Sequence, residues 1–186
     1  MEELIDVLNE KGESTGIKKE RNLVHIDGDW HKVVQIFIVN DNKILLQQRA
    51  LTKKSDPGKW CASSSGHISA GETSFETAIK EFYEELGVKA EQDKLRLVDT
   101  FKSPSITTNK GNIIYNNHFV DLYISEQIID LDKIHLQIEE VSQVKFFTIS
   151  EFERMVKSRD ERLTNTPTLF EHLWKKLQSK NLGEQR

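Results

Sequence analysis

The alternation of apolar and polar positions divides the chain into short strands and a few helices. Residues 4–8 alternate, and the Asn-Glu-Lys-Gly turn that follows predicts an N-terminal strand or hairpin. Residues 31–39 are rich in β-branched side chains and lead through a turn at 40–43 into the segment Ile44-Leu-Leu-Gln-Gln-Arg49, which predicts a second hairpin. Further strands are expected over residues 59–63, 96–101, 118–124 and 144–147.

A different period begins at residue 73 and predicts a helix over 73–86. Apolar residues recur there at spacings of three and four and form one stripe, made of Phe75, Ala78, Ile79, Phe82 and Leu86. Thr73 or Ser74 is suited to cap the start of this helix, and Gly87 suits a left-handed cap at its end. Two more helices are expected, one over 150–157 and one that begins near Thr166 with an inner stripe of leucines at 169, 173 and 177.

Strands mixed with a few helices indicate an α+β fold of the α-β-α sandwich type. The sequence contains no internal repeat, low-complexity run or Pro/Gly-rich linker that would mark a domain boundary. We therefore expect a single domain over residues 1–186, with an N-terminal hairpin segment at 1–28, a core at 29–150 and C-terminal helices at 150–181.

Composition narrows the classes of partner. The formal net charge is -4, which argues against a nucleic-acid duplex, because binding its backbone needs a basic face. A membrane helix needs about 18 uninterrupted apolar residues, and the sequence has no such run. A single cysteine, Cys61, and an acidic start (MEELIDVLNEKGE) without the pattern of a signal peptide predict a cytoplasmic protein.

Three glutamates carry the most specific chemistry. Glu81, Glu84 and Glu85 stand at i, i+3 and i+4, so their carboxylates project from one face of the expected helix. Such clusters are usually solvated surface, but a hard divalent cation such as Mg²⁺, which takes oxygen ligands, would also account for them.

The surrounding spacing resembles the Nudix box, a glycine, five residues, a glutamate, seven residues, then Arg-Glu-apolar-x-Glu-Glu-x-Gly-apolar. The positions in register are Gly66, Glu72, Glu81, Phe82, Glu84, Glu85, Gly87 and Val88. The resemblance implies a mixed-sheet α-β-α sandwich and Mg²⁺ (or Mn²⁺) bound by the three helix glutamates, with a backbone carbonyl of Ser65 or Gly66 beside them. The one departure is Lys80, where the family has an arginine that pairs with the glutamate found here at 72.

The resemblance also implies hydrolysis of a diphosphate linkage in a small molecule. Glu84 or Glu85 would serve as general base, unless a glutamate from a distant loop does so, for which Glu140 and its neighbour Glu139 are the candidates. Solvent-exposed loop charges are the alternative for that pair. The expected substrate-binding residues are Arg49, Lys53 with Lys54, and Trp60, although a tryptophan after Pro-Gly-Lys is as readily explained by packing.

A wider resemblance, over about residues 1–150, is to the Nudix branch that contains isopentenyl-diphosphate isomerase and its hydrolase relatives. The isomerase uses a cysteine directly before the Gly-His of the box and a glutamate on a later strand. Here the position of the cysteine is occupied by Ser65, and residues 116–123 contain no matching glutamate. A hydroxyl cannot replace the more acidic thiol as proton carrier, so the hydrolase is favoured.

The metal site of the isomerase also uses histidines. The resemblance suggests His25, His31 and His67 as their counterparts in this chain.

A non-catalytic binding module is the third possibility, but the box glutamates that such a protein would be expected to lose are all present. The box does not specify the substrate. We expect a nucleoside diphosphate derivative, selected by loops such as Thr107–Asn117. Nudix proteins often dimerise, so a homodimer is compatible with the resemblance.

Overall fold

The computed structural model describes residues 3–53, 55–109 and 111–183. The strands are β1 (Leu4–Leu8), β2 (Ser14–Glu20), β3 (His31–Asn40), β4 (Lys43–Arg49), β5 (Trp60–Cys61), β6 (Ser64–His67), β7 (Leu95–Asn109), β8 (Asn112–Ser125) and β9 (Val141–Thr148). The helices are α1 (Arg21–Asp27), α2 (Ser74–Leu86), α3 (Ile149–Ser158) and α4 (Pro167–Gly183), with 3-10 turns at Gln92–Lys94 and Leu131–Lys133.

The main sheet is mixed and forks along β3. Its strand order is β5-β4-β3-β8-β7, with β3 and β8 parallel and the other pairs antiparallel. One edge of β3 pairs first with β6, at residues 33–36, and then with β4, at residues 38–40. β9 extends the far edge of β4, while β1 and β2 form a small separate sheet. The prediction of an α+β fold with a mixed sheet is confirmed.

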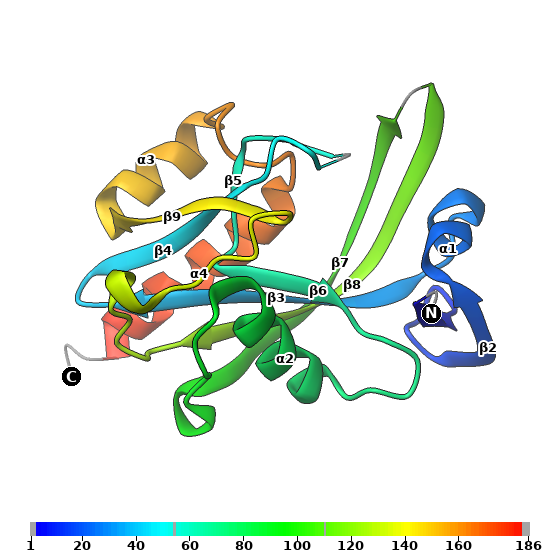
Figure 1. The fold of residues 1–186 in the computed structure, drawn as a ribbon, viewed down its shortest axis with the longest axis horizontal. Helices are drawn as coiled ribbons and strands as arrows, with labels where there is room; N and C mark the ends of the chain where they lie inside the picture. The colour runs from blue at the N-terminus through cyan, green and yellow to red at the C-terminus, as the bar shows by residue number, and fades with distance from the viewer. Residues whose placement is uncertain (1–2, 54, 110, 184–186) are drawn as a thin grey trace.

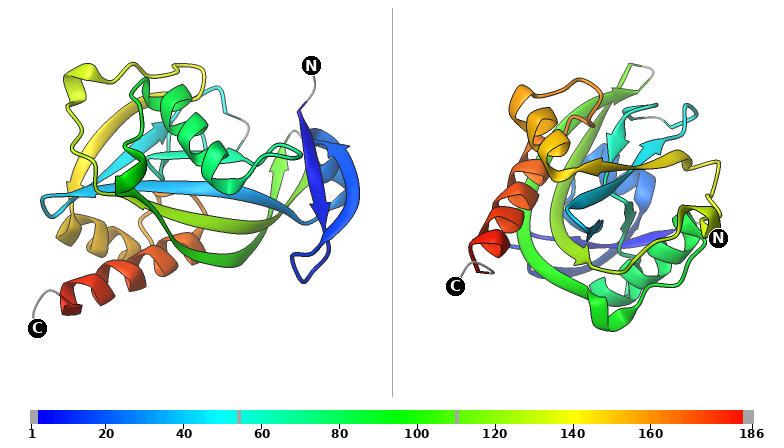
Figure 2. Two further views of the ribbon diagram at one scale, coloured as in Figure 1. Left: turned by 90° about the horizontal axis from the view of Figure 1, so that it is seen from below. Right: turned by 90° about the vertical axis from the view of Figure 1, so that its left-hand side faces the viewer.

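Helices cover both faces of the main sheet, and β3 supplies side chains to both. Figure 2 shows α2 on one face and α3 with α4 on the other. Ile36 and Ile38 pack toward α2, whereas Phe37 packs toward α3 and α4. The leucines predicted as the inner stripe of α4 are buried, as expected. None of the described helices has the length and apolar character that crossing a bilayer needs.

The N-terminal hairpin is confirmed as β1 and β2, but the sequence pattern missed α1. The strand expected over 59–63 is broken into β5 and β6. Ser63 explains the break, because its hydroxyl donates to the Leu45 carbonyl at 2.5 Å and accepts from the Ile38 amide at 2.8 Å. This side chain bridges β3 and β4 at the point where the sheet forks.

The expected polar loop over 107–117 is mostly strand. β7 and β8 pair from Leu95↔Ser125 out to Asn109↔Asn112, and Figure 1 shows this long hairpin reaching beyond the rest of the sheet. Backbone pairing carries both strands through this segment, although its run Asn109-Lys-Gly-Asn112 predicted a loop. Phe75, expected in the core, is instead 37% exposed; it lies in the first turn of α2, where its ring meets that of Tyr123.

We expect Thr73→Ala to destabilise the helix that carries the glutamates. Thr73 Oγ1 accepts from the Glu76 amide at 3.2 Å and Glu76 Oε2 accepts from the Thr73 amide at 3.0 Å, which completes a capping box. Loss of such a cap costs about 1 kcal/mol of unfolding free energy. Urea denaturation should show this loss for Thr73→Ala and little change for Thr73→Ser, which keeps the hydroxyl. Equal stability of the alanine and serine variants would contradict the role of the cap.

Candidate active site

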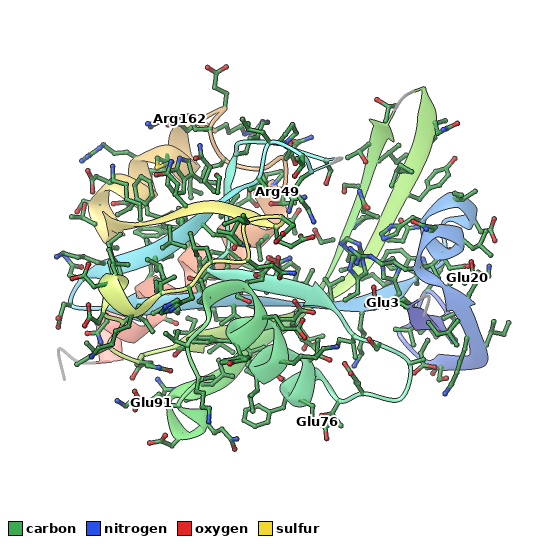
Figure 3. The ribbon with its side chains drawn as sticks, in the orientation of Figure 1. Glu3, Glu20, Arg49, Glu76, Glu91 and Arg162 are labelled. Carbon is green, nitrogen blue, oxygen red and sulfur yellow. The ribbon has the colours of Figure 1, made fainter. Side chains whose placement is uncertain are left out.

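A cleft of about 1590 Å³ opens beside α2 and contains most of the residues expected at the site. Its walls come from α1, the end of β4, β6, α2, β8 and the loop before β9. Figure 3 labels Arg49 near β9 and Glu3 on the side of the N-terminal hairpin, and both line this cleft. The cleft therefore runs between the main sheet and the N-terminal unit, which consists of β1, β2 and α1.

The three box glutamates project from α2 into this cleft, but their surroundings differ. Glu84 is exposed, Glu81 is half-buried and Glu85 is only 6% exposed. The helix places them so because Ala78, Phe82 and Leu86 are held on its opposite, core-facing side. Gly87, with a φ of 69°, ends the helix directly after this turn.

Glu85 lies at the fork between β4 and β6. Its Oε2 accepts a hydrogen bond from the Ser65 amide at 2.9 Å and from Gln47 Nε2 at 3.3 Å. Burial raises the pKa of this carboxyl to about 7, although the bond from Ser65 acts in the opposite direction. The carboxylate is thus held by one strand on each side of the fork.

Glu81 packs directly on the backbone of Gly66. A Cβ built on Gly66 would lie 2.1 Å from Cδ of Glu81, so a side chain at position 66 would displace this carboxylate. Burial, together with the charges of Glu85 and Glu84, raises the pKa of Glu81 to about 8. Close carboxylates that resist ionisation together are suited to sharing a cation.

Glu72 braces the loop that leads into α2. It accepts a hydrogen bond from Thr77 Oγ1 at 2.9 Å, and it forms an ion pair with Lys80 at 3.5 Å. Lysine therefore pairs with the same glutamate that the resemblance assigned to the arginine.

We expect Lys80→Met to have a small effect. Both partners of the ion pair are partly exposed, and such pairs contribute less than about 1 kcal/mol. This corresponds to less than a ~10-fold change in kcat/KM even if all of it is lost in the transition state. Lys80→Arg, with its two-pronged geometry, should match or exceed the wild type in thermal denaturation and in activity. A large loss in Lys80→Met would show that Lys80 contacts the substrate.

The expected phosphate-binding residues lie at the β4 end of the cleft. Arg49 donates from Nε to the Ser55 carbonyl at 2.9 Å, and Lys53 forms an ion pair with Glu140. Glu139 and Glu140 both line the cleft. Lys54 lies outside the described residues.

The expectation that Trp60 binds the substrate is not met in the structure. It is only 8% exposed, packs edge-on against Phe147 and belongs to the core cluster under α3 and α4. Its backbone pairs with Gln48 in the sheet, which turns the indole away from the cleft. Packing, rather than stacking on a nucleobase, accounts for this tryptophan.

Four histidines meet at the end of the cleft nearest the N-terminal unit. One ring nitrogen from each lies within 4.8 Å of the others. They are His25 on α1, His31 on β3, His67 on β6 and His118 on β8. Burial lowers the pKa of all four, that of His31 to about 4, which favours the neutral form of the imidazoles.

Sequence reasoning missed His118. The sequence placed His118 at the start of a predicted strand. It did not show which other strand would pair with that strand, and therefore which residue would lie beside His118. In the structure β8 runs parallel to β3 and places His118 directly beside His31. Long-range strand register therefore completes the cluster.

Neither the thiol of Cys61 nor the hydroxyl of Ser65 is suited to the proton transfer that an isomerase requires. Cys61 is buried in β5, and burial raises the pKa of its thiol to about 12. Ser65, at the position of the isomerase cysteine, offers its backbone amide to Glu85. Cys61 lies at the margin of the cleft, but its buried, poorly acidic thiol is unsuited to carry a proton.

Comparison with known proteins assigns the chain to a family. The profile of the NUDIX domain matches residues 29–166. "Nudix hydrolase 3" of Arabidopsis thaliana is 43% identical over 163 residues, which cover 86% of this chain and 21% of that protein. The chain thus spans about a fifth of that relative's length. An "Isopentenyl-diphosphate Delta-isomerase" of Dinoroseobacter shibae is 31% identical over 144 residues, 75% of this chain and 76% of that protein.

The fold is shared with solved structures. The crystal structure of DR0079 from Deinococcus radiodurans superposes with a TM-score of 0.66 over 91% of this chain and 98% of that chain, at 18% identity. At this identity the likeness concerns the fold alone.

Proposed function

This chain belongs to the Nudix family, and from that premise we propose that it is a Mg²⁺-dependent hydrolase of a diphosphate linkage in a small molecule. The observation that carries the proposal is the convergence of Glu81, Glu84 and Glu85 on one cleft from a single capped helix. A nucleoside diphosphate derivative is our first candidate substrate, by resemblance to hydrolase relatives.

The residues at the site fit a hard divalent cation. The donor set consists of carboxylates, Ser65 and Gly66 line the cleft beside them, and oxygen donors are those that Mg²⁺ prefers. We propose that a backbone carbonyl of Ser65 or Gly66 completes the set. The absence of a side chain at Gly66 leaves room for the Glu81 carboxylate to lie against the strand. We propose Glu81, Glu84 and Glu85 as the side-chain ligands, while a bound Mg²⁺ would supply neutralisation of charge on the diphosphate oxygens.

Other side chains of the cleft would bind the phosphates, position Glu85 and accept the proton of the attacking water. Arg49 and Lys53 supply positive charge at the β4 end, where the outer phosphate would bind. Gln47 and the Ser65 amide hold Glu85 in place by hydrogen bonds. Glu84, exposed to the cleft, accepts a proton from the attacking water. Glu140 is the second candidate for this role, although its ion pair with Lys53 would have to open first.

The reaction has a simple balance. The oxygen of water forms a bond to one phosphorus, the bridging P–O bond breaks, and the bridging oxygen leaves with the other phosphorus. The water loses one proton to the general base. A nucleoside diphosphate would therefore give a nucleoside monophosphate and inorganic phosphate.

Isomerisation of isopentenyl diphosphate is the second candidate, because a relative with that name is 31% identical. It requires groups that protonate and deprotonate carbon. The buried Cys61 and the hydroxyl of Ser65 are both poorly suited to this, since neither is acidic enough. These observations favour the hydrolase.

A substrate panel tests the proposal. Purified protein is incubated with Mg²⁺ and nucleoside diphosphates, triphosphates, nucleotide sugars or isopentenyl diphosphate, and products are separated by chromatography. We expect release of phosphate or a monophosphate that stops when a chelator removes the metal. Formation of dimethylallyl diphosphate would instead support the isomerase. A panel without any turnover would favour a non-catalytic binding module.

A further inference from the structure

We propose that the cleft wall formed by the β7–β8 hairpin selects a substrate whose diphosphate carries an uncharged, hydroxyl-rich group, such as a ribose or another sugar. The residues to which we assign this selection are Ser105 and Asn116, with Thr107 beside them. The inference rests on the proposed function, because it concerns the group joined to the diphosphate that the box glutamates would bind. It adds a specificity that the box itself does not encode.

One face of the hairpin turns toward the cleft. The β7 residues that line the cleft alternate with exposed ones, as expected for a strand with one face against a cavity. These lining residues are Ser103, Ser105 and Thr107. Strand register places Asn116 opposite Ser105 and Ile114 opposite Thr107, and both of these β8 residues also line the cleft. The wall is therefore one face of a two-stranded ribbon, with a row of hydroxyl groups along β7.

Ser105 and Asn116 form a polar rung across the hairpin. Asn116 Nδ2 donates a hydrogen bond to Ser105 Oγ at 3.4 Å. In the described part of the chain, the amide oxygen of Asn116 and the hydroxyl hydrogen of Ser105 have no other partner. A rung that can both donate and accept suits neighbouring hydroxyl groups of a ligand, which also do both.

The hairpin wall differs in charge from the side of the cleft that would bind the phosphates. Arg49 and Lys53 lie at the β4 end. By contrast, none of the described hairpin residues that line the cleft is a lysine, arginine, aspartate or glutamate. Arg21 on α1 also lines the cleft, but it is paired with Glu3 at 3.1 Å. The hairpin wall therefore suits an uncharged group, while the phosphates belong near the β4 end.

The order of residues along the hairpin places the polar rung near the diphosphate. His118, at the base of this face, pairs in register with His31 of β3, and β3 also pairs with β6, which holds Gly66 against Glu81. Asn116 lies two residues further out, about 7 Å along the strand. The cleft-lining isoleucines of β8 follow only toward the tip. A group joined directly to the diphosphate would therefore meet hydrogen-bonding side chains before apolar ones.

The described lining of the cleft offers no aromatic platform for a nucleobase. Phenylalanine, tyrosine and tryptophan are absent from these lining residues, although proteins often hold bases by stacking them on such rings. The specific contacts of the wall would therefore be made to a sugar rather than to a base. An isoprenoid chain, which has no hydroxyl group, would leave the polar rung without a partner.

Binding of matched ligands tests the inference without requiring turnover. The wild-type protein with Mg²⁺ is titrated calorimetrically with three diphosphate analogues in which a methylene group replaces the bridging oxygen. They are those of uridine diphosphate, of its 2′,3′-dideoxy form, and of ribose 5-diphosphate, which lacks the base. Each lost hydrogen bond corresponds to about 2- to 10-fold in affinity, so the dideoxy ligand should bind ~10-fold or more weakly. Removal of the base should cost less than removal of the two hydroxyl groups.

Variants of the rung test the assignment of residues. Asn116→Ala should weaken binding of the uridine ligand by about 2- to 10-fold but leave binding of the dideoxy ligand unchanged, so that the preference between them shrinks. Ser105→Ala should act in the same direction, and it provides the test if Asn116→Ala does not fold. The matched control is Thr108→Val on the exposed face of the same hairpin, which should keep the full preference.

The outcomes separate this inference from the hydrolase proposal. Equal affinity for the uridine and dideoxyuridine ligands, or an unchanged preference in the rung variants that fold, would overturn the inference and leave the hydrolase proposal intact. A larger loss on removal of the base than on removal of the hydroxyl groups would also overturn it. If none of the three ligands binds, the inference fails, and the substrate panel alone decides whether the protein is a hydrolase.

Discussion

Glu84→Gln should lower kcat by ~10²–10⁴-fold, the range in which a general base contributes, while the protein keeps its thermal stability. Glu84 is exposed to the cleft and its amide analogue has almost the same size, so folding should be unaffected. Steady-state kinetics on the best substrate of the panel, with a thermal melt of the same sample, checks both halves of this expectation.

Glu85→Gln provides the informative contrast. The same loss of activity is expected, but with a change in stability as well, because Glu85 accepts hydrogen bonds from both Ser65 and Gln47. If Glu84→Gln retains full activity while Glu140→Gln is inactive, the general base lies on the loop before β9 and our assignment is wrong.

Gly66→Ala is the second change with a large expected effect. The new Cβ would meet the Glu81 carboxylate at 2.1 Å, so that carboxylate must move away from its position against β6. Displacement of a reacting group by about 1 Å can cost ~10²-fold in rate. We expect a loss of this order in kcat/KM, a higher Mg²⁺ requirement and a circular dichroism spectrum like that of the wild type.

A double-mutant cycle sharpens this expectation. If Gly66→Ala acts by displacing Glu81, it should add little to the loss already caused by Glu81→Gln. Fully additive losses would mean that the alanine damages the site by another route.

The sequence predicted the parts of the site that lie close together in the chain. The spacing of the three glutamates, the cap at Thr73 and the stop at Gly87 all follow from the period of one helix, and the structure contains this helix as α2. The pairing of Glu72 with a basic residue eight positions later was also foreseen from the resemblance.

Features that depend on contacts across the sheet were missed. Trp60 follows a turn and looks available in the sequence, but pairing of β5 with β4 buries it. Residues 107–117 look like a loop because they contain the polar run Asn109-Lys-Gly-Asn112, yet backbone pairing makes them mostly strand. His118 reaches the other histidines only because β8 runs parallel to β3. The alignment of β8 with β3 cannot be predicted from the residue pattern of either strand alone.

The parallel pairing of β3 with β8 also has a consequence for folding kinetics. It joins His31 to His118, so the chain between them must close into a large loop before the contact stabilises anything. Local hairpins such as β3–β4 and β7–β8 should form early, and their docking should limit the folding rate, as expected at high contact order. The histidine cluster would therefore assemble among the last features of the native state.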